Sequence, residues 1–221
     1  MLDSGYRITE GVLTVAECDA LRLSIASRDH RNGRASVRNV MGNPVVAAVA
    51  ADPRLLELAA DALGRRAVPY RATLFDKSYR ANWLVAWHQD TTLPLAVKTD
   101  SDEWGPWSAK AGRLYARAPR WALERIVALR VHLAASTPDN GPLRVIPGSQ
   151  HAGVLSHEDI VAMARLVEPV DCIVGRGGVL AMRPLLIHAS SKARLDLPRP
   201  VIHIEYADNP ELRPGVRLAL A

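Results

Sequence analysis

The sequence lacks the features that mark disulfide-rich, membrane-spanning or secreted proteins. There are only two cysteines, Cys18 and Cys172, and their wide separation and apolar surroundings predict reduced core thiols, because a disulfide framework needs more. No apolar run is long enough to span a membrane, and no signal segment is recognisable at the N-terminus. We therefore expect a cytoplasmic protein with no membrane partner.

Blocks of charge, internal repeats and low-complexity tracts are absent as well. The net charge of +5 comes mostly from scattered arginines, so it is a weak indication of nucleic-acid binding, and it also suits an anionic small substrate. Aromatic residues are few, at 5%, which leaves little material for a lid over a site. What remains is a 48% hydrophobic chain of 221 residues, enough for one domain, 1–221, with a real core.

The N-terminal third carries the signals of helix ends. Each predicted start combines a side chain that caps the first turn with a favourable neighbour, and Gly64 suits the left-handed end of the last helix. We therefore expect an N-terminal helical layer over residues 1–66. The predicted starts are a capping box at Thr14–Glu17 and the pairs Asn43-Pro44 and Asp52-Pro53.

From residue 67 onward the pattern changes to short β-rich runs without strand-helix-strand alternation, which disfavours a parallel doubly wound sheet. We expect a mainly β fold with flanking helices (α+β), a jelly-roll core over 67–207. Residues 91–122 show no clear pattern, which is typical of a lid or a binding loop. The predicted strands are 68–76, 83–88, 126–133, 170–174, 178–182, 185–189 and 200–206, and one more short helix starts at Ser156–Asp159.

Alternation along three of these strands separates an apolar face from a face with ionisable groups. Solvated faces look similar, but water-facing strands usually carry Lys, Glu, Ser and Thr, so we favour a shared interior cavity. In 82–90 the polar face is Asn82, Leu84, Ala86, His88 and Asp90, and the opposite face, Trp83, Val85, Trp87 and Gln89, should pack on helices. In the two later strands the polar faces are Arg130 with His132, and Arg199, Val201, His203 and Glu205.

His88 and Asp90 place an imidazole and a carboxylate at one strand end, which is two thirds of a metal site. His188 has the best context for the third ligand, because it ends the apolar run Leu185–Ile187. Two neutral imidazoles and one carboxylate bind Fe(II) on one face of an octahedron and leave three positions open. A hydrolytic zinc site uses the same ligand types and stays an alternative.

Ser190 and Arg199 follow His188 at offsets of two and eleven residues. An antiparallel return of the last strand would bring Arg199 to the metal end of the cavity, where its guanidinium would bind a carboxylate bidentately and Ser190 would add a hydrogen bond. The alternative is a surface pair between Arg199 and Asp196 or Glu205, with Ser190 as a strand-end hydrogen bonder. The joint spacing favours the first interpretation.

With these motifs, the sequence resembles the phytanoyl-CoA dioxygenase-like branch of the Fe(II)- and 2-oxoglutarate-dependent oxygenases. The resemblance covers roughly 70–207 and implies a double-stranded β-helix (cupin-like) core. The implied cofactors are Fe(II), 2-oxoglutarate and O2, with ascorbate as an addition in vitro. The matching stretches are NWLVAWHQD at 82–90, DNGPLRVIPGSQHAG at 139–153, and His188-x-Ser190 followed by Arg199 and HIEYA.

The resemblance also implies residue roles. His88, Asp90 and His188 would bind iron, and Ser190 and Arg199 would hold the distal carboxylate of 2-oxoglutarate. Asn82 and Lys77 occupy positions that relatives use near the cosubstrate. Gln150 stands where many relatives carry His, and His151 is a possible replacement. The presence of Asp90 favours hydroxylation, desaturation or cyclisation over halogenation.

The substrate side is less defined. We expect a small molecule oxidised at an aliphatic C–H bond, with release of succinate and CO2. The alternatives are a nucleic-acid demethylase of the same fold, which the offsets of Arg194 and Arg199 do not match, and a non-catalytic metal-binding jelly roll. Candidate substrate residues are His132, Arg130 and His203, which would line the cavity or be satisfied core residues, and Trp104 and Trp107, which would cover the site or anchor their loop.

Overall fold

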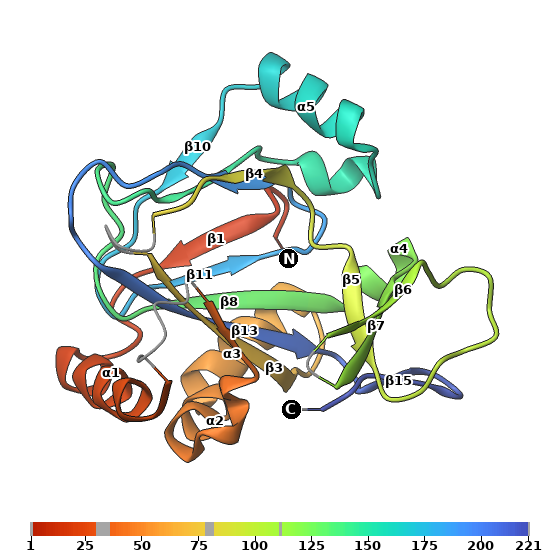
Figure 1. Ribbon diagram of the computed structural model, residues 1–221, viewed down its shortest axis with the longest axis horizontal. Helices are drawn as coiled ribbons and strands as arrows, with labels where there is room; N and C mark the ends of the chain where they lie inside the picture. Colours follow the sequence, from red (N-terminus) through yellow and green to blue (C-terminus); the bar gives the residue numbers. More distant parts are fainter. Residues whose placement is uncertain (1, 30–35, 78–81, 111, 221) are drawn as a thin grey trace.

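Two antiparallel sheets face each other, and three helices cover the outer face of the larger one (Figure 1). The computed structural model describes residues 2–29, 36–77, 82–110 and 112–220. This arrangement confirms the mainly β jelly-roll prediction. In spatial order the larger sheet contains β1 (Tyr6–Thr9), β11 (Val179–Met182), β8 (Ile126–His132), β13 (Arg199–Ala207), β3 (Val68–Lys77) and β2 (Ser36–Arg38). The smaller sheet contains β10 (Val170–Cys172), β9 (Leu143–Val145), β12 (His188–Ser190) and β4 (Val85–His88).

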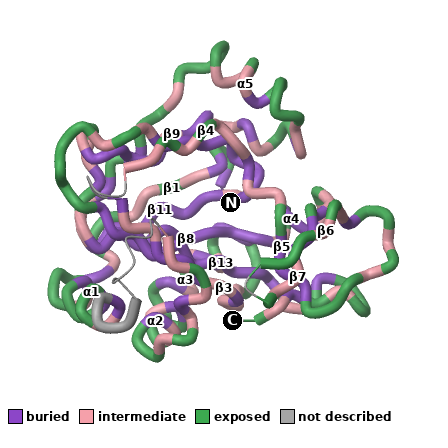
Figure 2. Tube along the Cα trace, in the orientation of Figure 1, coloured by how far each residue is buried: buried purple, intermediate pink, exposed green. Residues whose placement is uncertain are grey.

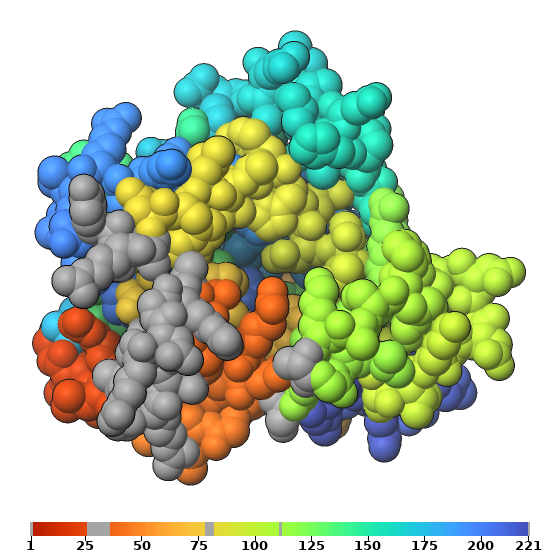
Figure 3. Space-filling view, in the orientation of Figure 1, coloured from red at the N-terminus to blue at the C-terminus, as the bar shows by residue number. Residues whose placement is uncertain are grey.

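The central strands are buried on both faces. Every residue of β8, β11, β12 and β13 is buried, and Figure 2 shows this buried centre between more exposed helices and loops. Between the two sheets the molecule is hollowed, and Figure 3 shows the opening beneath the segment that carries β4 (yellow). The fold therefore holds a cavity between two rigid walls.

The helices α1 (Val15–Asp29), α2 (Pro44–Ala50) and α3 (Pro53–Leu63) begin where the capping signals predicted. Asn43 and Asp52 cap α2 and α3 with their side chains, and Gly64 ends α3 with a φ of 69°. Their apolar faces pack on the larger sheet in one core cluster, in which Leu55 of α3 and Leu129 of β8 are fully buried. Among the described residues, none of the helices has both the length and the apolar character that crossing a bilayer requires.

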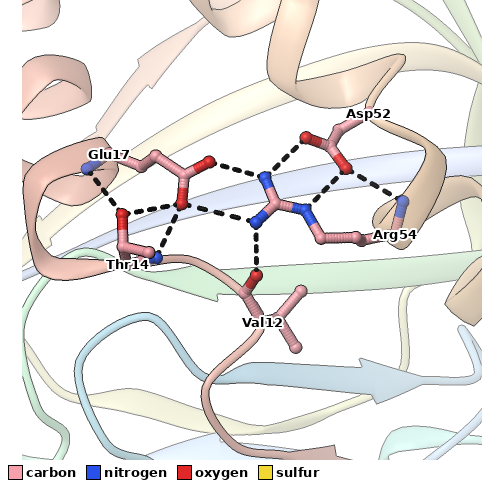
Figure 4. A network of polar contacts seen from close by, with 5 residues as sticks. All are labelled: Val12, Thr14, Glu17, Asp52 and Arg54. Carbon is pink, nitrogen blue, oxygen red and sulfur yellow. Dashed lines mark hydrogen bonds and ion pairs between the residues drawn. The ribbon is translucent and has the colours of Figure 1, made fainter.

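Arg54 joins the starts of two helices (Figure 4). Its guanidinium contacts Glu17 of the α1 capping box at 2.6 Å and the α3 cap residue Asp52 at 2.7 Å, and donates to the Val12 carbonyl at 2.9 Å. The hydrogen bond from Arg54, with those from Thr14, lowers the pKa of Glu17 to about 2. The two helix starts are therefore coupled although they are far apart in sequence.

The structure differs from the sequence-based assignment at both ends of the larger sheet. The N-terminal third is not only helical, because β1 pairs with β11 and β2 pairs with β3 at the two sheet edges. These strands are three or four residues long, too short for a clear alternation to show in the sequence. The division into a helical layer, 1–66, and a core, 67–207, stays a prediction.

Residues 91–122 are also more regular than predicted. They contain a small sheet of β5 (Thr92–Leu95), β7 (Arg113–Arg117) and β6 (Trp107–Lys110), followed by α4 (Arg120–Leu123). The predicted strand 185–189 is shifted, because residues 184–186 form a turn and a bend and β12 begins only at His188. The remaining elements are η2 (Val40–Gly42), η3 (Ser149–Ala152), α5 (His157–Leu166), β14 (Glu211–Arg213) and β15 (Val216–Arg217).

Candidate metal centre

A cavity of about 240 Å³ lies between the two sheets, and the predicted metal ligands line it. The Nε2 atoms of His88 and His188 lie 3.8 and 3.7 Å from the carboxylate oxygens of Asp90. One ligand atom from each of the three residues falls within 4.8 Å of the others. This spacing fits three donors around one ion, so the structure brings the predicted trio together.

Hydrogen bonds at the rear of both imidazoles set which nitrogen faces the cavity. The Nδ1 atom of His88 lies 2.8 Å from the Ala86 carbonyl, and that of His188 lies 2.9 Å from the Leu186 carbonyl. A carbonyl only accepts, so each Nδ1 donates, and Nε2 is left with a free lone pair. Fixing the tautomer in this way is how protein metal sites orient histidine ligands.

A β-bulge in β4 corrects the predicted strand faces. His188 pairs with His88, but Ser190 pairs with Val85, so β4 has one extra residue between these two points. A bulge reverses the alternation; Trp83 and Val85 therefore line the cavity together with His88 and Asp90, and Leu84 is exposed. Trp83 and Val85 were predicted to pack on helices.

Trp87 and Gln89 hold the metal strand from behind, as their predicted face requires. Trp87 packs against the cluster of Ile146, Ile160 and Ile187. The buried Gln89 amide donates to the carbonyls of Gly153 and Leu185 at 2.8 and 2.7 Å, and its oxygen accepts from the Leu155 N–H at 3.0 Å. Hydrogen bonds to both the nitrogen and the oxygen of its side-chain amide therefore fix Gln89, which lies between His88 and Asp90 in the sequence.

The electrostatics keep the ligands in metal-binding form. Burial lowers the pKa of His188 to about 4, against the opposing effect of Asp90. Burial alone would raise the pKa of Asp90, but His188, His203 and His88 outweigh it and lower that pKa below its usual value. The Asp90 and His88 side chains are still 42% and 40% exposed, so the site is open toward the cavity, where further ligands have room.

The neighbouring end of the cavity is basic and incompletely paired. Lys77 is buried and donates to the Ser190 hydroxyl at 2.8 Å, and Arg199 is 3% exposed with its Nε donating to the Asn140 carbonyl at 3.4 Å. Among the described residues, none accepts a hydrogen bond from the buried Nη1 atom of Arg199. Because a buried guanidinium with an unpaired N–H is costly, this arrangement suits an anionic ligand. The role of Arg199 and Ser190 toward 2-oxoglutarate stays a prediction.

Gly141 lets the backbone approach closely at this end. Its φ is +67°, and a Cβ there would lie 2.5 Å from the Ser191 carbonyl oxygen and 3.2 Å from Lys77 Cδ. The Gly141 carbonyl also accepts the hydrogen bond of the Ser190 hydroxyl at 2.9 Å. A larger residue would push the loop away from Lys77 and Ser190, so glycine is needed here for the shape of the basic end.

The three predicted substrate residues on the larger sheet differ in position. Arg130 and His203 line the cavity, side by side in the β8–β13 register, with 3.2 Å between Arg130 Nη1 and His203 Nδ1. Burial lowers the pKa of His203 to about 3, so its ring is neutral. His132 is fully buried, both of its ring nitrogens lack a hydrogen-bond partner, and it is not part of the cavity lining.

Other predicted residues lie away from the cavity. Both ends of the Asn82 amide form hydrogen bonds with the backbone of Ala193, so Asn82 holds the segment after β12 in place, and it does not belong to the cavity lining. Trp104 is buried in a separate cluster with an edge contact to Trp121, and Trp107 packs against that cluster, so both anchor the small sheet. Gln150 and His151 contact the carbonyl of Asp3 outside the cavity.

Three residues of the cavity wall were not predicted. Arg71, Thr73 and Phe75 of β3 line the cavity beside the predicted Lys77. Arg71 donates hydrogen bonds to the buried Glu205, which alternation had placed on the polar face of its strand, and the Tyr70 hydroxyl donates to the same carboxylate. The two-residue spacing of the β3 residues is visible in the sequence, so the alternation along 68–77 predicts them as well.

Comparison with known proteins places the chain. The family model described as phytanoyl-CoA dioxygenase (PhyH) matches residues 1–201. No curated protein sequence gives a significant match. The match over most of the chain confirms the resemblance identified from the motifs.

Solved structures share the fold at low identity. EctD from S. alaskensis is 23% identical with a TM-score of 0.70, over 93% of this chain and 73% of its own. AviO1 from Streptomyces viridochromogenes Tue57 is 20% identical with a TM-score of 0.67, over 99% and 94%. HygX from Streptomyces hygroscopicus, with iron bound, is 18% identical with a TM-score of 0.65, over 93% and 83%. Other EctD crystals contain Fe, or 2-oxoglutarate with 5-hydroxyectoine.

The family match, together with three convergent donors beside an unpaired guanidinium, leads to one assignment. This chain belongs to the phytanoyl-CoA dioxygenase (PhyH) family and is an Fe(II)- and 2-oxoglutarate-dependent oxygenase.

Proposed function

We propose that this protein hydroxylates an aliphatic C–H bond of a small molecule, with release of succinate and CO2. The observation that supports the proposal most strongly is the adjacency of two sites in one cavity: the donor trio His88, Asp90 and His188, and the basic end with Lys77, Ser190 and Arg199. A cosubstrate with a carboxylate at each end needs a metal with open positions for one end and an anion-binding site for the other, and the two sites lie side by side here.

Each residue has a defined task in this proposal. His88, Asp90 and His188 hold Fe(II) from one side, and Arg199 binds the far carboxylate of 2-oxoglutarate through its unpaired Nη1. Lys77 orients the Ser190 hydroxyl and adds positive charge. When bound, iron and 2-oxoglutarate supply the oxidising chemistry, in which O2 and cosubstrate yield succinate, CO2 and the hydroxylated product.

The surrounding wall controls the environment of the reaction. Trp83 and Phe75 bring apolar rings to the cavity, while Tyr115 closes it toward the small sheet. Such walls exclude water and strengthen the electrostatic contacts inside. Asp90 occupies a coordination position, which favours hydroxylation over halogen transfer in the family.

The test is an anaerobic titration of the purified protein with Fe(II) and 2-oxoglutarate, followed by a succinate assay in air. We expect a visible charge-transfer band and slow succinate release. The Arg199→Met variant should need about 10- to 100-fold more 2-oxoglutarate, because a charge-assisted bond contributes about 1.5–3 kcal/mol. Arg199→Lys should be intermediate, and Arg165→Met, on the exposed side of α5, should match the wild type. A wild-type protein without the band and without succinate release would refute the proposal.

A further inference from the structure

Arg130 is a buried cation that forms no ion pair with any residue that the structure describes. It projects into the cavity from the middle of β8, is 7% exposed, and its Nε atom has no hydrogen-bond partner. Within the described part of the chain, its side chain makes one hydrogen bond, with His203 Nδ1. A guanidinium can only donate, so His203 accepts as a neutral ring and supplies no negative charge.

The nearby acidic groups are committed elsewhere. Among the residues that the structure describes, Glu205 pairs with Arg71, and Asp90 lies within 4 Å of the two ligand histidines. The Asp90 charge still attracts Arg130, but from beyond ion-pair distance, so it does not replace a direct acidic partner. Arg130 instead lies over the ring of Phe75, 5.3 Å from its centre. A cation–π contact of this kind is worth about 0.5–2 kcal/mol, less than the several kcal/mol that an ion loses on leaving water.

Binding of metal and cosubstrate would not supply the missing charge. The two charges of Fe(II) and those of Lys77 and Arg199 outweigh Asp90 and the two carboxylates of 2-oxoglutarate. Arg130 therefore still lacks a direct acidic partner in the loaded site. It is in register with His203, whereas Arg199 pairs with Lys77, so the two guanidinium groups start from different points of the sheet. Their charges repel each other: after burial, which is the larger cause, Arg130 lowers the pKa of both Arg199 and Lys77. This leaves one group to neutralise it, the substrate.

The exposed residues at the opening of the cavity are positively charged, like Arg130 inside it. Arg38 of β2 and Lys110 of β6 are exposed lining residues, and the Lys110 ammonium lies 5.8 Å from the Tyr115 ring centre. Cations at the opening and at the floor of a narrow cavity concentrate anions in it. The exposed part of the lining therefore carries the same positive charge as Arg130.

We propose that the substrate carries a carboxylate or phosphate group and that Arg130 binds this group, which orients the attached aliphatic chain toward the metal. The proposal rests on the proposed oxygenase function and specifies its substrate class. The cavity of about 240 Å³ is below the roughly 300–1,000 Å³ of sites for drug-sized ligands. Because 2-oxoglutarate shares it, the anionic substrate is small.

The test uses protein with Zn(II) in place of Fe(II) and saturating 2-oxoglutarate, so that no turnover occurs and the Arg199 end is filled. Hexanoate, hexyl phosphate and the neutral, similarly sized hexanamide are titrated by calorimetry. We expect at least one anion to bind the wild type tenfold or more tightly than hexanamide, and the better anion distinguishes a carboxylate from a phosphate substrate. Arg130→Met should reduce the preference to within twofold, Arg130→Lys should retain part of it, and Arg165→Met should keep all of it.

The Fe(II)–2-oxoglutarate band is recorded for the same variants as an independent reading. Arg130→Met should keep the band and the wild-type affinity for 2-oxoglutarate. If the band is intact but the wild type does not prefer the anions, or Arg130→Met keeps the preference, the anionic substrate is refuted while the oxygenase function stands. A loss of 2-oxoglutarate affinity in Arg130→Met would assign Arg130 to the cosubstrate and overturn the proposal. If Arg130→Met does not fold, the comparison of Arg130→Lys with the wild type gives the answer.

Discussion

His188 lies directly opposite His88 across the β4–β12 pair, with their ring centroids 4.1 Å apart and their planes at 50°. The two residues are far apart in the 221-residue sequence, and the pairing of β4 with β12 brings them together. Both send Nδ1 to a backbone carbonyl two residues back, so the pair is matched in tautomer as well as in position. The pairing of two strands in the smaller sheet therefore positions both histidines of the candidate metal site.

Removal of one member of this pair should abolish metal binding. His188→Ala leaves two donors, and because loss of a supporting residue alone typically costs 10- to 100-fold in metal affinity, we expect a decrease of more than about 100-fold. Equilibrium dialysis with Mn(II) measures it. His157→Ala, an exposed histidine on α5, is the matched control and should bind as the wild type does. Equal affinity of both variants would exclude His188 as a ligand.

The metal-free protein should lose stability as pH falls from about 6.5 toward 4. His188 and His203 have folded-state pKa values of about 4 and about 3, below the unfolded value of 6.5, mainly because of burial. The unfolded chain therefore binds more protons in this range, so stability is complete above pH 6.5 and decreases below it, by up to about 3 kcal/mol from His188. Urea midpoints at pH 7 and pH 5 in EDTA measure the change.

Variants separate this effect from general acid sensitivity. His203→Gln removes one depressed pKa and should flatten the dependence between pH 7 and pH 5. His157→Gln changes an exposed histidine and should leave the slope unaltered. A wild-type protein equally stable at both pH values would contradict the assignment of neutral, buried histidines.

Gln89→Met should weaken both the fold and the metal site. The substitution leaves two buried carbonyls and one N–H without their partners, which we expect to lower the free energy of unfolding by about 3 kcal/mol. His88 and Asp90 flank Gln89, so metal affinity should fall in parallel. Gln150→Met, which loses contacts near the surface, should cost about 1 kcal/mol and keep metal affinity. Urea unfolding measures the stability of the two variants, and Mn(II) binding measures their metal affinity. A Gln89→Met variant no worse than Gln150→Met in both would contradict the prediction.

Arg54→Met should destabilise the helical face without affecting the site. Its guanidinium joins two helix starts, but it is 43% exposed, so we expect a loss of about 1 kcal/mol. Arg120→Met breaks a single exposed i, i+4 pair with Glu124 and should cost about 0.5 kcal/mol or less. High salt should narrow the difference, because exposed ion pairs are screened. Equal urea midpoints of the two variants would show that the Arg54 network adds nothing.

Local chemistry in the sequence was enough for several elements. The capping box at Thr14–Glu17 and the left-handed Gly64 each depend on groups within about one helical turn, so the sequence alone predicts them, although Arg54 later adds a distant contact to Glu17. Alternation also placed Arg130, His203 and Arg199 on an interior face, because β8 and β13 are regular strands with a continuous register. The HxD spacing and the distant His188 identified the donor trio from residue types alone.

Tertiary structure decided the rest. The bulge between Val85 and His88 depends on how β4 meets β12, and it turned Trp83 toward the cavity against the simple alternation. The edge strands β1 and β2 are too short to be stable by themselves and form only on an existing sheet. Whether Arg130 of β8 has an acidic partner depended on Glu205 of the neighbouring strand β13 pairing with Arg71 of β3 instead. The sequence by itself determined which chemical groups are available, and only packing decided which charges remain unpaired, because pairing is set by distances between segments far apart in the chain.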